Sequence, residues 1–224
     1  MELTASPRVD LLRGLSVEIA HNYSRGRILL AVDGVLGSGT AEFADGLAAT
    51  LRESGHDVFR ASIDDFRAPR AERERDGADS PRGFYEDEYD YGTFRRVLVD
   101  PFRMPGSAGF QTAAFDAAAD APLDARWQTA GKDAVLIVDG VFLNRPEIHG
   151  VWHYSIYLEV PWETAYARLA AAGRADADPA SPANRRTRDG QDRYLAEVFP
   201  RGVANAIVDN TDAEHPVRSF ADSC

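Results

Sequence analysis

The chain has 224 residues, of which 44% are hydrophobic and 27% charged, so it is long enough to form one sizeable α/β core. Its formal net charge of −11 argues against nucleic-acid and anionic-membrane binding, because affinity for a phosphate backbone comes from clustered lysine and arginine. No apolar run approaches the roughly 20 residues of a membrane helix, no signal peptide is evident, and the single cysteine, Cys224, allows no intrachain disulfide, so we expect a cytoplasmic protein.

Residues 7–23 have the spacing of an amphipathic helix, and the next segment, residues 28–47, carries the most informative pattern in the chain. An apolar run from 28 to 32 predicts a strand, glycines follow at 34, 37 and 39, and apolar residues then recur at helical spacing. Such a turn can bind phosphate, because glycines let backbone N–H groups converge and the helix N-terminus carries partial positive charge. The alternative is a glycine turn that binds nothing. The residues expected to bind a nucleotide here are Gly34, Gly37, Ser38, Gly39, Thr40 and Ala41.

The spacing of Gly34 and Gly39 is that of the P-loop motif, G-x-x-x-x-G-K-[ST], but the last two motif residues are replaced. Thr40 stands where a lysine would reach the β- and γ-phosphates, and Ala41 stands where a hydroxyl would bind Mg²⁺. The only lysine, Lys132, precedes a predicted strand, at the end of an α/β sheet where ligands do not usually bind. Any replacement charge must therefore come from an arginine.

Carboxylates follow two further predicted strands. Asp64 and Asp65 come shortly after the strand expected at 57–61, and Asp139 directly follows the continuous apolar run 134–138, which is typical of a buried parallel strand. A carboxylate near a substrate hydroxyl can accept its proton as the oxygen attacks phosphorus, and an acidic residue at a second strand end holds Mg²⁺ in P-loop proteins. The alternatives are a helix cap for the first pair and an acidic turn residue for Asp139.

The remaining elements are simpler to predict. Residues 67–90 are charged and broken by proline and glycine, so we expect them outside the core. The later elements that we expect are a short helix at 91–99 that ends before Pro101, a strand within 153–161, a helix at 162–172 and a last strand at 206–208. An arginine cluster, residues 174–193, lies between the last helix and the last strand.

Several stretches resemble the uridine kinase family of P-loop kinases, over most of residues 27–211. The stretches that carry the resemblance are ILLAVDGVLGSGT, SIDDF, DSPRGFY with YDY, FQTAAFD, VDG, RRTRDGQDRYL and AIVDN. The resemblance implies an α/β fold of P-loop kinase type, with a parallel sheet flanked by helices in a single domain over 1–224. It further implies a substrate-side insert at 67–124 and a small lid at 174–193.

The resemblance also implies residue roles. Asp64 would be the catalytic base and, with Asp139, a Mg²⁺ ligand, while Arg186 would close on the phosphates as part of the lid. Asn210 would lie near the adenine of ATP. The residues that would contact the substrate are Phe66, Tyr85, Asp87, Phe115, Asp116 and Gln191. Where better-known members carry a base-contacting histidine, this chain has Ala119 or Asp120, which leaves open whether the site selects a pyrimidine.

Three functions remain open. The first is ATP- and Mg²⁺-dependent phosphorylation of a nucleoside or similar small hydroxyl substrate. The second is a non-kinase enzyme acting on a phosphorylated metabolite, and the third is a non-catalytic nucleotide-binding pseudokinase. The residues at Thr40 and Ala41 favour the last two, whereas the acceptor-side residues favour the first two. We expect small-molecule and nucleotide ligands, no nucleic acid or membrane partner, and allow for a homo-oligomer.

Overall fold

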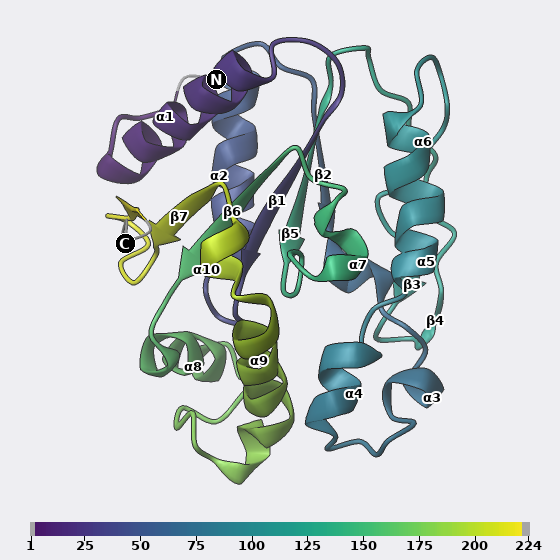
Figure 1. Ribbon diagram of the computed structural model, residues 1–224, viewed down its shortest axis with the longest axis vertical. Helices are drawn as coiled ribbons and strands as arrows, with labels where there is room; N and C mark the ends of the chain where they lie inside the picture. Colours follow the sequence, from purple (N-terminus) through teal and green to yellow (C-terminus); the bar gives the residue numbers. More distant parts are fainter. Residues whose placement is uncertain (1–2, 221–224) are drawn as a thin grey trace.

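A computed structural model describes residues 3–220. Cys224 and the first two residues, on which the disulfide and signal-peptide expectations rest, lie outside this range. The chain forms a six-stranded sheet in the order β2-β5-β1-β6-β7-β8 with helices on both faces (Figure 1). Its strands are Ile28–Gly34 (β1), Val58–Ser62 (β2), Val135–Gly140 (β5), Tyr154–Glu159 (β6), Ala206–Asp209 (β7) and Val217–Ser219 (β8). All neighbours pair in parallel except β7 and β8.

The central strand β1 is buried along all seven residues. It lies between β5 and β6, and helices cover both of its faces, which is why it reads as a continuous apolar run rather than an alternating one. Leu30 and Val32 belong to one core cluster, whereas Leu29 and Ala31 belong to the other. The expected α/β fold with a mostly parallel sheet is therefore confirmed.

Helices form a layer on each face of the sheet. On one face lie α1 (Pro7–Asn22) and α2 (Thr40–Glu53), whose apolar residues share a cluster with β1. The other face is covered by α5 (Tyr91–Phe94), a π-helical turn (Arg95–Val99) and α6 (Asp100–Arg103). Helix α4 (Pro81–Glu86) lies beyond the carboxyl ends of the strands (Figure 1). The remaining helices are α3 (Arg70–Arg73), α7 (Pro146–His149), α8 (Trp162–Ala171), α9 (Arg185–Val198) and α10 (Pro200–Val203). Short 3₁₀ turns span Ile63–Phe66 and Pro182–Asn184, and a small ribbon pairs Phe115–Asp116 (β3) with Ala121–Pro122 (β4).

Two expectations about the middle of the chain were wrong. Residues 67–90 were expected outside the core, but Phe84, Tyr85 and Tyr89 are buried there, because their rings pack on Phe142 beyond the end of β5. The helix expected to end before Pro101 continues through α6. Pro101 is the second residue of α6, which follows directly on the π-helical turn Arg95–Val99.

The carboxyl ends of β1, β2 and β5 meet where α2 begins. Helices α8 and α9 lie beyond this end of the sheet on one side, and α3 and α4 lie on the other (Figure 1). In open α/β sheets, ligands bind at this end. Within residues 3–220, no helix has both the length and the apolar character needed to cross a membrane.

Candidate functional site

The turn between β1 and α2 requires its glycines. Gly37 and Gly39 have φ angles of 81° and 87°, in the left-handed region that favours glycine. A Cβ atom on Gly37 would lie 2.3 Å from the carbonyl oxygen of Ala165 in α8, and one on Gly34 would lie 2.4 Å from the Ser38 hydroxyl. The turn is therefore packed directly against α8 and leaves no room for side chains at these positions.

The backbone amides of this turn are largely unpaired. The amide of Ser38 donates to the Val35 carbonyl at 2.9 Å, and that of Leu36 donates to the Gln191 side chain at 2.5 Å. Four other backbone amides of the turn, those of Gly37, Gly39, Thr40 and Ala41, have no hydrogen-bond acceptor among the residues described. Amides at the N-terminus of a helix carry partial positive charge, so they form a ready site for an anion.

Two polar side chains hold this turn from the outside. Arg168 of α8 donates to the carbonyl oxygens of Gly37 at 3.3 Å and Asn210 at 2.9 Å. The Asn210 amide group in turn donates to the Ser38 carbonyl at 2.7 Å. Because the carbonyl groups of the turn are bonded on this outer side, the shape that leaves its amides free is fixed before any ligand binds.

The turn borders a cavity of about 470 Å³, within the usual size range of small-molecule sites. The other side chains that line it come from β-strand ends and the residues after them, from α1 and α8, from the segment between α4 and α5, and from the start of the segment after α8. They include Arg8, Ser62, Asp64, Tyr89, Asp139, Arg168, Arg174 and Asn210. Arg174 was expected among the lid arginines. Within the described chain, it is the one of the three cavity arginines for which no hydrogen bond or ion pair of the side chain is found.

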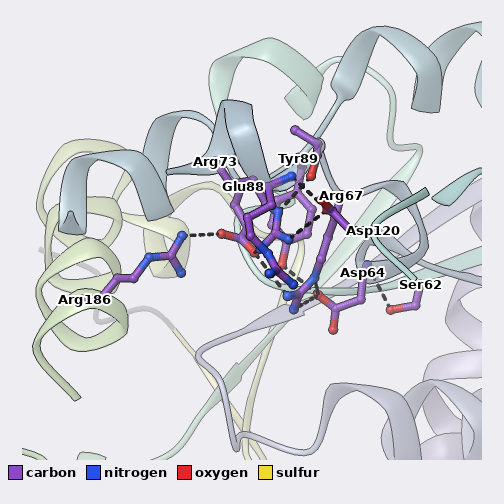
Figure 2. Close-up of polar contacts among 10 residues, drawn as sticks. Ser62, Asp64, Arg67, Arg73, Glu88, Tyr89, Asp120 and Arg186 are labelled. Carbon is purple, nitrogen blue, oxygen red and sulfur yellow. Dashed lines mark hydrogen bonds and ion pairs between the residues drawn. The ribbon is translucent and has the colours of Figure 1, made fainter. Parts of the chain in front are cut away.

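Asp64 presents one carboxylate oxygen to this cavity. Its Oδ1 accepts hydrogen bonds from Arg67 Nη2 and from the Tyr89 hydroxyl, each at 2.9 Å (Figure 2). Its Oδ2 has no partner among the residues that the structure describes, and the side chain is 41% exposed. Burial raises the pKa of Tyr89 well above its ordinary value, so this hydroxyl stays a neutral donor. The carboxylate is held in place at one oxygen and available at the other.

The carboxylate of Asp139, unlike that of Asp64, forms an ion pair with an arginine of the neighbouring strand. Its Oδ1 lies 2.7 Å from Nη2 of Arg60, a residue of the neighbouring strand β2. Burial raises the pKa of Asp139, and the adjacent Arg60 guanidinium opposes that rise. P-loop enzymes hold Mg²⁺ between such an aspartate and the hydroxyl of the motif Ser/Thr. Here Ala41 has no hydroxyl and Asp139 is paired, and no group of three potential metal-binding side chains occurs within residues 3–220. The residues present do not fit that Mg²⁺ site.

Arg186 lies outside the cavity, at a buried carboxylate. Glu88 is 1% exposed and lies 2.8 Å from Arg186 Nη2, 3.2 Å from Arg67 Nη1 and 3.5 Å from Arg73 Nη1 (Figure 2). The Arg186 guanidinium also lies over the ring of Phe84, 5.0 Å from its centroid. In this conformation the arginine expected to close on phosphates binds Glu88 instead.

The residues expected to contact a substrate are dispersed. Phe66 packs on Phe94 in the core, and Tyr85 packs on Phe142. Phe115 is buried in β3, Asp116 accepts from the amides of Ala118 and Ala119, and Asp87 follows the end of α4. None of these five side chains lines the cavity, and Gln191 reaches the site only through the Leu36 amide.

Three cavity residues were not expected from the sequence. Tyr89 lies in a charged segment assigned to the surface, although its aromatic neighbours Phe84 and Tyr85 were a signal for burial. Arg168 is the one basic residue of the helix at 162–171, and Arg8 is the second residue of the first helix. Neither pattern distinguishes a site residue from a surface residue.

The fold is shared with solved structures of other proteins. The sequence matches no protein-family model, and no curated protein matches it. Among solved structures, a possible uridine kinase from Bacillus stearothermophilus superposes with a TM-score of 0.69 at 23% identity, covering 89% of this chain and 96% of that one. A candidate fructose transport system kinase from Silicibacter sp. TM1040 gives a TM-score of 0.62 at 24% identity, covering 85% and 95%. D-glycerate 3-kinase from Cryptococcus neoformans gives 0.52 at 11%, covering 85% of each chain. The chain has the fold of these P-loop kinases.

Proposed function

We propose that this protein is a P-loop phosphotransferase that moves the terminal phosphoryl group of ATP to a nucleoside-like or other small hydroxyl substrate. One observation carries the proposal: four unpaired amides of the β1–α2 turn and the unpaired Oδ2 of Asp64 belong to residues that line the same cavity. An anion site and a proton acceptor within one cavity are the two parts that phosphoryl transfer to an alcohol needs.

The phosphates of ATP would bind at the amides between Gly37 and Ala41. The motif lysine is absent, and Arg174 is the cavity arginine free to supply positive charge in its place. Guanidinium–phosphate pairs are strong and bidentate, so an arginine suits this position. Arg186 could contribute only after the N-terminal end of α9 moves away from Glu88.

Asp64 would act as the general base. The substrate hydroxyl loses its proton to Oδ2 of Asp64 as its oxygen attacks the γ-phosphorus, and the bond from that phosphorus to the β–γ bridging oxygen breaks to release ADP. Arg67 and Tyr89 hold the other carboxylate oxygen and so fix its orientation. Such positioning of reacting groups is a major source of rate acceleration in phosphoryl transfer.

The names of the structural neighbours support a hydroxylated small molecule as the class of acceptor. A possible uridine kinase, a candidate fructose transport system kinase and a D-glycerate 3-kinase share the fold, and each name refers to a hydroxylated small molecule. Contacts from Tyr85, Asp87, Phe115 and Asp116 remain predictions that require movement within residues 67–124. A cytoplasmic location and a homo-oligomer likewise remain predictions.

The decisive experiment is a phosphate-transfer screen of nucleosides, sugars and small hydroxy acids with ATP, followed by two aspartate variants. We expect Asp64→Asn to lower kcat by about 100-fold or more, the usual contribution of a general base, with little change in ATP affinity. Asp65→Asn is the matched control, because Asp65 is adjacent in sequence but does not line the cavity. Equal losses in the two variants would contradict the role of Asp64.

A second candidate is a nucleotide-binding module without turnover. It is favoured by Thr40 and Ala41, which remove the lysine and the hydroxyl that P-loop enzymes use in transfer. Heat of ATP binding in calorimetry, without a phosphorylated product from any acceptor in the screen, would select this candidate over the phosphotransferase.

A further inference from the structure

The Arg60 guanidinium is bonded to two residues that in P-loop enzymes help to hold a divalent cation, although Arg60 itself does not line the cavity. In those enzymes Mg²⁺ lies between the hydroxyl of the last motif residue and the aspartate at the end of a nearby strand. The corresponding residues here are Ala41 and Asp139. Arg60 Nη2 donates to both, to the Ala41 carbonyl oxygen at 3.4 Å and to Asp139 Oδ1 at 2.7 Å.

The fold fixes Arg60 in this place. Strand β2 pairs with β5 so that Arg60 is opposite Ile137 and Ser62 is opposite Asp139, which puts Arg60 two residues before the strand end beside Asp139. Every group of its guanidinium has an acceptor. Besides Ala41 and Asp139, these acceptors are Asp45 Oδ1 at 2.9 Å, the Ile137 carbonyl at 3.0 Å and the Ala61 carbonyl at 3.3 Å.

This arrangement removes the two ligands of the usual P-loop metal site, the motif hydroxyl and the strand-end carboxylate. Ala41 offers no side-chain oxygen, and the Asp139 carboxylate is only 6% exposed and already paired with a fixed positive charge. A divalent cation placed beside it would also be repelled by Arg60, and repulsion between like charges is strong where little water intervenes. The unpaired amides of the turn, in contrast, bind an anion without the help of a metal.

We propose that Arg60 occupies the carboxylate of Asp139 in place of a divalent cation, so that this site binds the polyphosphate of its nucleotide as the metal-free anion. The inference rests on the proposed function, because the ligand is the nucleotide phosphate group at the β1–α2 turn. It differs from that proposal in what it requires: nucleotide binding must not need Mg²⁺.

The test is calorimetric titration of the wild-type protein with ATP, once in EDTA and once with saturating Mg²⁺. We expect a Kd in EDTA that is no more than threefold larger than the Kd with Mg²⁺. A larger advantage for Mg²⁺ would overturn the inference while leaving the proposed function in place. Absence of binding in both conditions would overturn the inference and the proposed function together.

A pair of variants tests the role of Arg60 itself. The double variant Arg60→Gln, Ala41→Ser frees Asp139 and restores a hydroxyl, so we expect its ATP affinity to become at least tenfold tighter with Mg²⁺ than in EDTA. Electron paramagnetic resonance of Mn²⁺ in the presence of ATP should show a protein-bound signal, distinct from that of the Mn²⁺–ATP complex in solution, with this variant and not with the wild type. The control is Asp45→Asn, which removes one partner of Arg60 but leaves Asp139 paired. Two results would contradict the proposed role of Arg60. One is a dependence of ATP affinity on Mg²⁺ in the control that equals that of the double variant. The other is the absence of this dependence in a double variant whose melting curve shows that it is folded.

Discussion

Glu88 shows how one residue can join two distant parts of this chain. It follows α4 in sequence and is almost completely buried, and its three arginine partners come from the 67–90 segment and from α9. A buried carboxylate is costly unless it is paired, and here each oxygen faces at least one guanidinium. The ion pair with Arg186 therefore ties the N-terminal end of α9 to the segment 67–90.

We expect Glu88→Gln to lower the free energy of unfolding by about 3 kcal/mol, the usual scale for breaking a buried ion pair, because three partly buried guanidinium groups lose their shared counter-charge. Urea denaturation at neutral pH measures the change. Glu86→Gln is the matched control two residues away. Its carboxylate pairs with Arg82 and Arg193 at the surface, so its loss should cost about 0.5 kcal/mol. Equal losses in the two variants would show that Glu88 is not the anchor of α9.

The site residues that belong to a local sequence pattern were predictable from the sequence. The glycines at 34, 37 and 39 were recognisable by spacing, and Asp64 and Asp139 by their positions after apolar runs. Arg60 had no such signal. It lies inside a strand, and its contact with Ala41 and Asp139 exists only because β2 pairs with β5 and α2 packs across them. A contact that depends on three elements cannot be read from one segment.

At the scale of elements, the β1–α2 turn and α8 are expected to act as one unit, and Gly37 tests this. Gly37→Ala places a methyl group against the Ala165 carbonyl and adds the strain of a positive φ. We expect a loss of about 2–3 kcal/mol of stability and an ATP affinity at least tenfold weaker. Melting curves and calorimetry provide the two measurements.

The control for this substitution is Gly26→Ala. Gly26 has a similar φ of 86°, but a Cβ atom there meets nothing within 4 Å, and the residue precedes β1 at the other end of the sheet. It should cost about 1 kcal/mol and leave ATP binding unchanged. If Gly37→Ala binds ATP as tightly as Gly26→Ala does, the turn is not the anion site.

Elements with continuous or periodic apolar patterns were predictable, and elements stabilised by distant partners were not. The strands β1 and β5 and the helix α2 were located from their own residues. The short edge strand β8 was not expected, because Val217–Ser219 carries no apolar run and forms by pairing with β7. The same holds for α4, whose Phe84 and Tyr85 are buried because they pack on Phe142 beyond the end of β5.

At the scale of the whole molecule, Asp33 lies where three parts of the fold meet. It is the second-last residue of β1 and is fully buried. Its carboxylate accepts from the Leu143 amide at 3.3 Å, from Asn144 Nδ2 at 2.7 Å and from the Tyr194 hydroxyl of α9. Burial outweighs these hydrogen bonds and raises the pKa of Asp33 to about 6, from an ordinary 3.8.

A pKa raised in the folded state means that the folded protein binds more protons than the unfolded chain between pH 4 and 6. The contribution of Asp33 to the free energy of unfolding therefore falls as pH rises through this window, by about 3 kcal/mol in total. Asp33→Asn cannot ionise and lacks this loss, while the other carboxylates titrate alike in both proteins. We expect the stability of the variant relative to wild type to rise by about 3 kcal/mol from pH 4 to pH 7, as measured by urea denaturation across that range. A difference that stays constant with pH would mean that the buried carboxylate is ionised at an ordinary pKa, stabilised by its hydrogen-bond donors rather than destabilised by its burial.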